Sequence, residues 1–198
     1  MLCVRLKSFD RICKATSGGV SRVWIFDRDD FDFTQAAADA DGNKPKYTAV
    51  ARRGGADADG GNLFPVKFQA KEAEYRYTQS LTGSSVKYEH VMEFLLADLD
   101  HFITQWNERV DAASACCGIG IIVELNSGII LVLGEKYVNG SSVREWKIAQ
   151  NGSTGTSGRL LEDANGQTTL LTGDYYRGAY EFSGLTSALE AFEPASAS

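Results

Sequence analysis

Hydrophobic and polar residues alternate along this chain with two different periods, and each period predicts one kind of element. Between residues 20 and 33 the pattern is that of a strand, with Val23 and Ile25 on one side and Trp24 and Phe26 on the other. Successive side chains of a strand point to opposite faces, so apolar residues at consecutive positions predict a strand that is covered on both sides. We therefore expect this stretch inside a layered β structure.

A helical period is visible in the middle of the chain, from residue 86 to residue 110. Apolar side chains recur there at spacings of three and four, which places them on one stripe of a helix with 3.6 residues per turn. The face that we expect to pack on a sheet consists of Val91, Leu95, Leu99, Phe102, Ile103 and Trp106. The pattern predicts one long central helix that serves packing and not ligand binding.

The shorter periodic segments predict strands on both sides of that helix. They cover residues 47–52, 63–70, 76–81, 120–125, 129–134, 143–149, 167–173 and 178–182. We expect the first two to form a hairpin, and residues 120–125 and 129–134 to form another through a loop that ends in Gly128. Strands before and after a single helix predict one α+β domain over residues 1–198, an antiparallel β-sandwich or open barrel with the helix packed against it.

Three segments are expected to extend from the domain core or to be mobile. Residues 27–65 are expected to form an extended arm or a long hairpin insertion. The stretch "QNGSTGTSGR", residues 150–159, is polar and rich in glycine, which predicts a mobile loop. Residues 185–198 end in "EPASAS" and predict a flexible tail.

Composition narrows the class of protein without identifying a reaction. The 198 residues carry a net charge of −6 and are 43% hydrophobic, which is ordinary for a globular chain long enough to bury a core without staples. An acidic chain is not expected to bind nucleic acid generally, since such binders show a basic face. The sequence has no apolar run of signal-peptide or membrane-spanning length, so we expect the protein in a cytoplasm.

The cysteines do not form a metal-binding pattern. Cys3 and Cys13 are ten residues apart, while Cys116 and Cys117 are adjacent, and no Cys-x-x-Cys pair occurs. The sequence predicts reduced and mostly buried thiols, with a composite zinc site of all four as the alternative.

Two near-copies of an Asp-x-Asp-Gly element resemble calcium loops. They read "ADADGN" at residues 38–43 and "ADADGGN" at residues 56–62. An EF-hand loop needs glycine at its sixth position and a bidentate Glu at its twelfth, whereas both copies bring glycine too early and place Val50 or Phe68 at the twelfth. We expect both to be turns, with a weak surface cation site as the alternative.

The other candidate motifs for metal binding, catalysis or phosphate binding are not favoured by their spacing or their setting. The acidic run Asp27, Asp29, Asp30 and Asp32 is typical of magnesium sites or acid–base pairs, but a solvated edge is the favoured interpretation. On the predicted helix, His90 and His101 would lie about 16 Å apart and exposed, too far apart to share a metal. The glycine series after residue 151 lacks the Lys-Ser/Thr of a phosphate loop. The sequence therefore predicts no catalytic residue, no metal ligand and no cofactor, and a protein that is not an enzyme.

Three features resemble the tail tube and major tail proteins of tailed bacteriophages. The first is "KATSGGVSRVWIFDRDDFDFT", residues 14–34, which looks like the glycine-led first strand pair of that family. The second is the central helix between β-rich halves. The third is "NGSTGTSGRLLEDANGQTTLLTGDYYRGAYEFS", residues 151–183, which looks like the family's C-terminal hairpins. The Asp-x-Asp-Gly pair and the two adjacent cysteines have no counterpart in that resemblance.

The resemblance implies a structural subunit of the virion, assembled in the cytoplasm of a bacterial host. Subunits of this family form stacked rings, commonly hexameric, whose sheets line a channel. Double-stranded DNA passes through without specific binding, other tail or connector proteins are partners, and no membrane insertion is implied. The subunit-interface residues expected on this hypothesis are Asp27, Asp29, Asp30, Asp39, Asp41, Asp57, Asp59, Gly152, Gly155 and Gly158.

Two other functions stay open at this point. One is a different ring protein of the virion, such as a head–tail connector, an adaptor or a tail terminator. The other is a metal- or sugar-binding β domain that uses the Asp-rich segments. Ring stoichiometry distinguishes the first from a tube subunit, and calcium titration tests the second.

Overall fold

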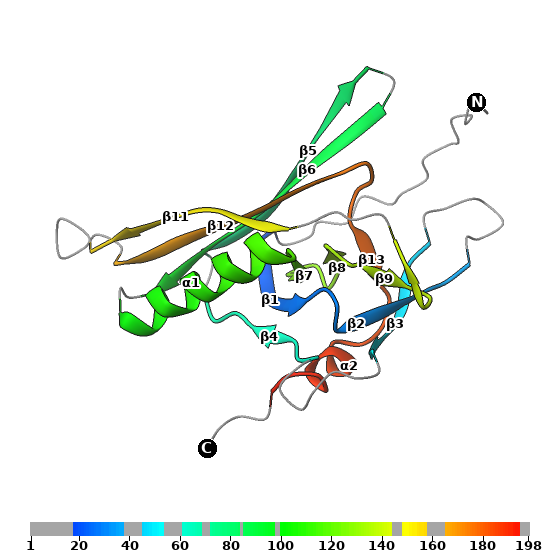
Figure 1. The fold of residues 1–198 in the computed structure, drawn as a ribbon, viewed down its shortest axis with the longest axis horizontal. Helices are drawn as coiled ribbons and strands as arrows, with labels where there is room; N and C mark the ends of the chain where they lie inside the picture. The colour runs from blue at the N-terminus through cyan, green and yellow to red at the C-terminus, as the bar shows by residue number, and fades with distance from the viewer. Residues whose placement is uncertain are drawn as a thin grey trace.

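The computed structural model describes residues 18–37, 45–53, 61–68, 72–83, 85–97, 100–143, 148–157 and 165–194. The fold is mainly β, with two sheets and two helices in this part of the chain. The prediction of an α+β, mainly antiparallel β-sandwich with a helix packed against it is confirmed (Figure 1). The prediction of one long helix is not.

The larger sheet has nine strands in the order β10-β9-β2-β3-β13-β8-β7-β1-β4. Its strands are β1 (Val20–Asp27), β2 (Phe31–Gln35), β3 (Tyr47–Arg52), β4 (Phe64–Pro65), β7 (Ile119–Leu125), β8 (Ile130–Leu133), β9 (Tyr137–Val138), β10 (Ser141–Ser142) and β13 (Tyr180–Phe182). The pairs β13–β3 and β2–β9 are parallel, and the other pairs are antiparallel.

The smaller sheet has four antiparallel strands in the order β11-β12-β6-β5. They are β5 (Ala73–Thr82), β6 (Ser85–Ala97), β11 (Ala149–Thr156) and β12 (Gly166–Tyr175). Figure 1 shows the end of the β5–β6 hairpin projecting well beyond the nine-stranded sheet. The two sheets share one core, to which Phe94 and Leu171 contribute from the smaller sheet and Ile121 and Val123 from the larger.

Strand β1 lies between two hydrophobic cores, as its sequence predicts. Val23 and Ile25 belong to the core between the two sheets, which also contains Phe94 of β6. Trp24 and Phe26 belong to the second core, on the other side of the nine-stranded sheet. All four β1 residues are buried, so the expectation of a strand covered on both faces is confirmed.

The predicted helix over residues 86–110 is a strand followed by a shorter helix. Strand β6 runs to Ala97, and α1 (His101–Cys116) begins after Asp100, whose carboxylate accepts a hydrogen bond of 2.7 Å from the backbone N–H of Ile103. Alternate residues of β6, from His90 to Leu96, are buried in a period of two. Apolar residues also occur on the other face of β6. Together with the buried residues they give spacings of three and four, which is why the sequence pattern resembled that of a helix.

The predicted packing face of that helix is therefore divided. Val91 and Leu95 lie on the half-buried outer side of β6, and Phe102 is 71% exposed at the start of α1. Ile103 and Trp106 do pack from α1 onto the core between the sheets. Leu99 lies outside the described residues.

The expected arm and the expected mobile loop are largely strands of the two sheets. Residues 27–65 supply β2, β3 and β4 to the nine-stranded sheet, and the strand expected at residues 47–52 is confirmed as β3. The expected hairpin is wrong, because β3 pairs with β2 and β13, whereas β4 pairs with β1. The expected mobile loop at residues 150–159 is β11 as far as Thr156, because its backbone pairs with β12. The hairpin of β7 and β8 through Gly128, at φ 80°, is confirmed.

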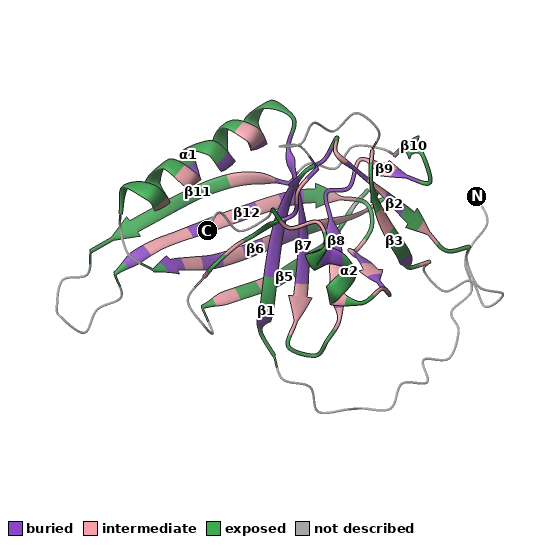
Figure 2. Cartoon of the chain, turned by 90° about the horizontal axis from the view of Figure 1, so that it is seen from below, coloured by how far each residue is buried: buried purple, intermediate pink, exposed green. Residues whose placement is uncertain are grey.

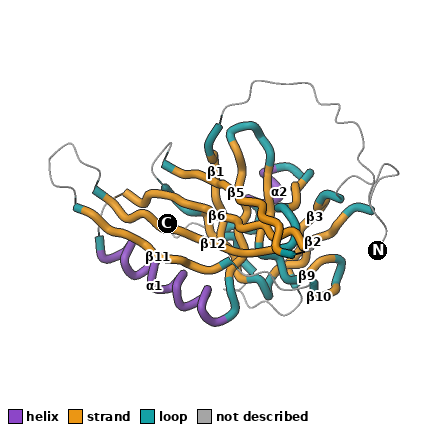
Figure 3. The backbone as a smooth tube through the Cα atoms, turned by 90° about the horizontal axis from the view of Figure 1, so that it is seen from above, coloured by secondary structure: helices purple, strands orange, loops and turns teal. Residues whose placement is uncertain are grey.

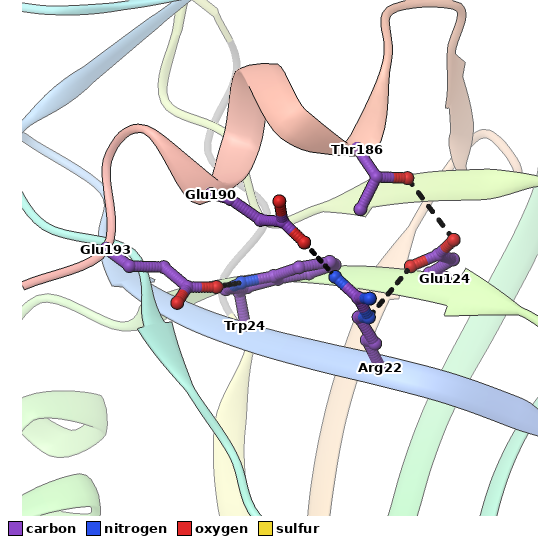
Figure 4. A network of polar contacts seen from close by, with 6 residues as sticks. All are labelled: Arg22, Trp24, Glu124, Thr186, Glu190 and Glu193. Carbon is purple, nitrogen blue, oxygen red and sulfur yellow. Dashed lines mark hydrogen bonds and ion pairs between the residues drawn. The ribbon is translucent and has the colours of Figure 1, made fainter.

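The expected flexible tail contains a second helix, α2 (Thr186–Glu190), as far as it is described. Leu189 is fully buried in the core that contains Trp24. The Trp24 indole N–H donates a hydrogen bond of 2.8 Å to Glu193, and Arg22 forms an ion pair with Glu190 (Figure 4). These contacts fold the segment against β1, so residues 185–194 are not a frayed end.

Candidate functional site

The most distinctive surface is the side of the four-stranded sheet that faces away from the nine-stranded sheet. We call it the polar face. Its members are Glu74, Arg76, Thr78 and Ser80 of β5, Lys87, Glu89, Val91, Glu93 and Leu95 of β6, and Thr168, Leu170, Thr172 and Asp174 of β12. Every one of them is exposed or half-buried, whereas the opposite side of the same strands carries the buried core residues (Figure 2).

Charged groups on the polar face are arranged in small networks. Glu74 and Glu93 are direct neighbours across β5 and β6, and Arg76 donates to both carboxylates at 3.1 and 2.9 Å. Lys87 forms an ion pair of 2.6 Å with Asp174, which lies opposite Glu89. The hydrogen bond that Arg76 donates to Glu93 raises the pKa of Arg76, and the one that Lys87 donates to Asp174 raises the pKa of Lys87. Carboxylates outnumber cations, so the face is acidic.

Both outer strands of this sheet have open edges. Strands β11 and β5 stand at the two ends of the strand order, and among the residues that the structure describes no strand pairs with the outer side of residues 149–156 of β11 or of β5. Directly before β11, Ile148 forms a single antiparallel bridge with Ile119 of β7. Residues 151–156 of β11 and 76–81 of β5 are exposed. Figure 3 shows the four strands side by side with α1 running next to β11. An open edge presents a row of backbone N–H and C=O groups that can pair with another chain.

The projecting end of the β5–β6 hairpin carries aromatic and aliphatic groups on the side opposite the polar face. Tyr77 is 58% exposed and its ring centroid lies 6.0 Å from that of Tyr88. Leu81, nearer the tip, is 75% exposed. A cleft of about 800 Å³ beside these groups is lined by Ser85, Val86, Val143, Tyr175, Tyr176 and Arg177. Exposed apolar surface of this kind is typical of contact sites.

His90 lies on β6 at the base of this aromatic group, and the expectation of an exposed histidine is wrong for it. The residue is 1% exposed, because it points into the core side of the sheet. Its Nε2 lies 3.3 Å from the Arg177 carbonyl, which can only accept, so Nε2 carries the proton. Nδ1 then accepts from the Tyr75 hydroxyl at 2.8 Å. His101, at the start of α1, is exposed as expected.

The predicted interface carboxylates at the β1–β2 turn are close together. The carboxylate of Asp29 pairs with Lys136 at 2.5 Å, and that of Asp30 accepts from the backbone N–H of Gly61 at 2.7 Å. Partial burial, followed by the negative charges of Asp30 and Asp29, raises the pKa of Asp27. Two of these three groups therefore stabilise contacts within the chain.

The predicted interface glycines lie elsewhere. Gly152 and Gly155 are on β11, at the open edge of the four-stranded sheet, whereas the acidic turn joins two strands of the other sheet. Asp39, Asp41, Asp57, Asp59 and Gly158 lie outside the described residues, and so do both Asp-Ala-Asp-Gly elements. In the part of the chain that is described, no group of three or more His, Cys, Asp or Glu side chains is arranged to hold a metal ion.

A buried arginine, which no sequence pattern identifies, joins the end of α1 to the nine-stranded sheet. Arg28 is 2% exposed; its Nε donates to the Gly134 carbonyl at 2.6 Å and its Nη1 to the Cys117 carbonyl at 3.0 Å. The acidic residues around it predict a solvated edge, which gives no indication of a buried arginine. The thiols of Cys116 and Cys117 are exposed, which corrects the expectation of buried cysteines for this pair.

Comparisons with family models, with curated proteins and with solved structures find no match to this chain. None of the helices in the described ranges has the length and apolar character needed to cross a membrane. The four-stranded sheet, with its open edges and its acidic polar face, is thus the strongest candidate for a functional surface in the described residues.

Proposed function

We propose that this protein is a structural subunit of a virion ring, of the kind that stacks into the tail tube of a tailed bacteriophage. The observation that carries the proposal is the four-stranded sheet, which is open at both edges and acidic on the face turned away from the core. Unpaired edges promote association with other chains, and a defined partner strand makes that association specific. A ring uses both edges.

The two edges are suited to head-to-tail contact. If β5 of one subunit lies beside β11 of the next, each copy uses two different surfaces, and this kind of contact closes into a ring when the rotation per subunit allows it. The sheets then continue from subunit to subunit around a closed barrel, and no edge remains. The nine-stranded sheet, with α2 packed against it, would form the outside of such a ring.

The charge of the polar face agrees with a channel for a polyanion. On this arrangement Glu74, Glu89, Glu93 and Asp174 face the lumen. Tight binding of DNA depends on Lys and Arg side chains that displace counterions from the phosphates. An acidic wall offers few such side chains. Double-stranded DNA would pass without specific binding, and other tail or connector proteins would contact the ends of the stack.

The exposed groups at the hairpin end supply a second contact in the proposal. Tyr77 and Leu81 are exposed on β5, and the end of the β5–β6 hairpin projects beyond the nine-stranded sheet. In the proposed assembly they would meet the adjoining ring or a neighbouring subunit. Burying them there would remove exposed apolar surface from water, at about 25 cal/mol per Å². Stacking and ring closure would then use different parts of one sheet.

Sedimentation velocity over a range of concentrations, followed by negative-stain electron microscopy, tests this function. We expect rings or tubes with a stain-filled centre to form as concentration rises. A chain that stays monomeric at every concentration contradicts the proposal. Single rings that never stack would instead indicate a connector or terminator, which occurs once per particle.

A further inference from the structure

Helix α1 ends in two adjacent exposed cysteines whose sulfur atoms are close together. Cys116 is the last helical residue and Cys117 is the C-cap, with φ −120° and ψ −9°. Their Sγ atoms are 3.3 Å apart, and both thiols are exposed. The hydrogen bond from Arg28 to the Cys117 carbonyl holds the backbone at this point. The pair thus offers two soft ligands on a fixed support.

The sulfur separation favours chelation over a disulfide bond. A disulfide needs an S–S distance of about 2.0 Å and usually a Cα–Cα distance of about 4.4 Å or more, whereas adjacent Cα atoms are about 3.8 Å apart. Two sulfur bonds of about 2.3 Å to one centre, at a right angle, place the sulfurs about 3.3 Å apart. Bond angles near a right angle are those of a pyramidal trivalent centre such as arsenic(III).

We propose that Cys116 and Cys117 form a dithiol site that chelates trivalent arsenic compounds. Such a centre needs only two sulfur ligands when its third bond goes to a carbon or oxygen substituent. This agrees with the surroundings, since the described residues place no third His, Cys, Asp or Glu there to complete a metal site. Zinc, which takes four ligands, is disfavoured for the same reason.

The chemistry proceeds without oxidation or reduction. With phenylarsine oxide, each thiol gives its proton to the arsenic-bound oxygen, two As–S bonds form, the As–O bonding is lost, and one water molecule leaves. Arsenic stays trivalent and keeps its phenyl group. The hydrogen bond with Cys116 raises the pKa of Cys117, so the thiol stays protonated at neutral pH and can supply that proton.

The test uses the full-length C3S/C13S variant, in which this pair supplies the only thiols. The protein is incubated with phenylarsine oxide and measured by intact-mass spectrometry and by titration of free thiols. We expect one phenylarsenic group per chain, the loss of both free thiols, and release by ethanedithiol. Adding C116S or C117S should abolish the uptake, and circular dichroism should show that each variant is folded.

Two results would overturn the proposal. One is a folded C3S/C13S chain that takes up no phenylarsenic group. The other is uptake that persists after either Cys116→Ser or Cys117→Ser, since a single thiol would then suffice. The outcome does not depend on whether the protein forms rings.

Discussion

Thr169 of β12 donates a buried hydrogen bond of 2.8 Å to the Oδ1 of Asn107 on α1, across 62 residues of sequence. The same asparagine donates through Nδ2 to the Ile103 carbonyl at 3.1 Å, one turn earlier in its own helix. This polar contact lies within the apolar layer between helix and sheet. It therefore fixes where α1 sits on the four-stranded sheet, which packing alone would leave less defined.

We expect the Asn107–Thr169 pair to show strong coupling in a double-mutant cycle. N107L and T169V should each lower the free energy of unfolding by about 1–3 kcal/mol, since each leaves a buried polar group without this partner. The double variant should be destabilised by less than the sum, because it removes both groups. Urea unfolding of the four proteins measures this, and strictly additive losses would contradict the account.

The C-terminal segment should contribute substantially to stability. Leu189→Ala removes a fully buried side chain and should lower the free energy of unfolding by about 2–5 kcal/mol. Leu185→Ala, in the same segment, truncates a side chain that is 76% exposed and should change it by less than about 0.5 kcal/mol. Equal, small effects of the two changes in thermal unfolding would indicate that the segment is not docked.

Asp27 should make stability depend on pH. Its pKa is raised in the folded state, so its contribution is most favourable below the unfolded pKa of about 3.9 and is lost as the pH rises through the folded pKa. Asp27→Asn removes a partly desolvated carboxylate that lies near Asp30 and Asp29. We expect this variant to be more stable than the wild type at pH 7 and the difference to vanish as the pH falls below about 3.9. A difference that grows on acidification has the wrong sign.

The open edge of β5 can be tested with two neighbouring proline substitutions. In an antiparallel edge strand, successive backbone N–H groups point alternately to the partner strand and outward. Of Thr78→Pro and Gln79→Pro, one therefore removes a hydrogen bond to β6 and the other removes an outward donor. We expect one variant to be destabilised and the other to remain folded yet lose ring formation in sedimentation velocity. If the folded variant assembles like the wild type, β5 is not a subunit contact.

The sequence predicted an element correctly where the apolar positions of that segment match the side chains that are buried. Strand β1 has apolar residues at consecutive positions because both of its faces are covered, so Val23 and Trp24 identify it directly. The prediction for β6 was wrong because Val91 and Leu95, on its less buried face, combine with Phe94 on the other face to imitate a helical stripe. Short-range spacing cannot separate these cases when apolar residues occur on both sides.

The candidate site was less predictable than the fold. Strand β11 is exposed along most of its length. Ser153, Thr154 and Gly155 therefore show no alternation of apolar and polar residues, and their composition predicts a loop. Whether a strand has an open edge depends on which strands pair with it. The pairing of distant segments such as β12 and β6 cannot be inferred from the sequence of either segment alone. The same holds for Arg28, whose two carbonyl partners lie 89 and 106 residues away.

The central claim is that the four-stranded sheet lines a channel, and an electron cryo-microscopy reconstruction of the assembled protein tests it most directly. We expect a closed ring in which β5 of each subunit adjoins β11 of the next and Glu74, Glu89 and Glu93 face the lumen. A ring in which this sheet lies on the outside, or in which both of its edges remain unpaired, would contradict the account.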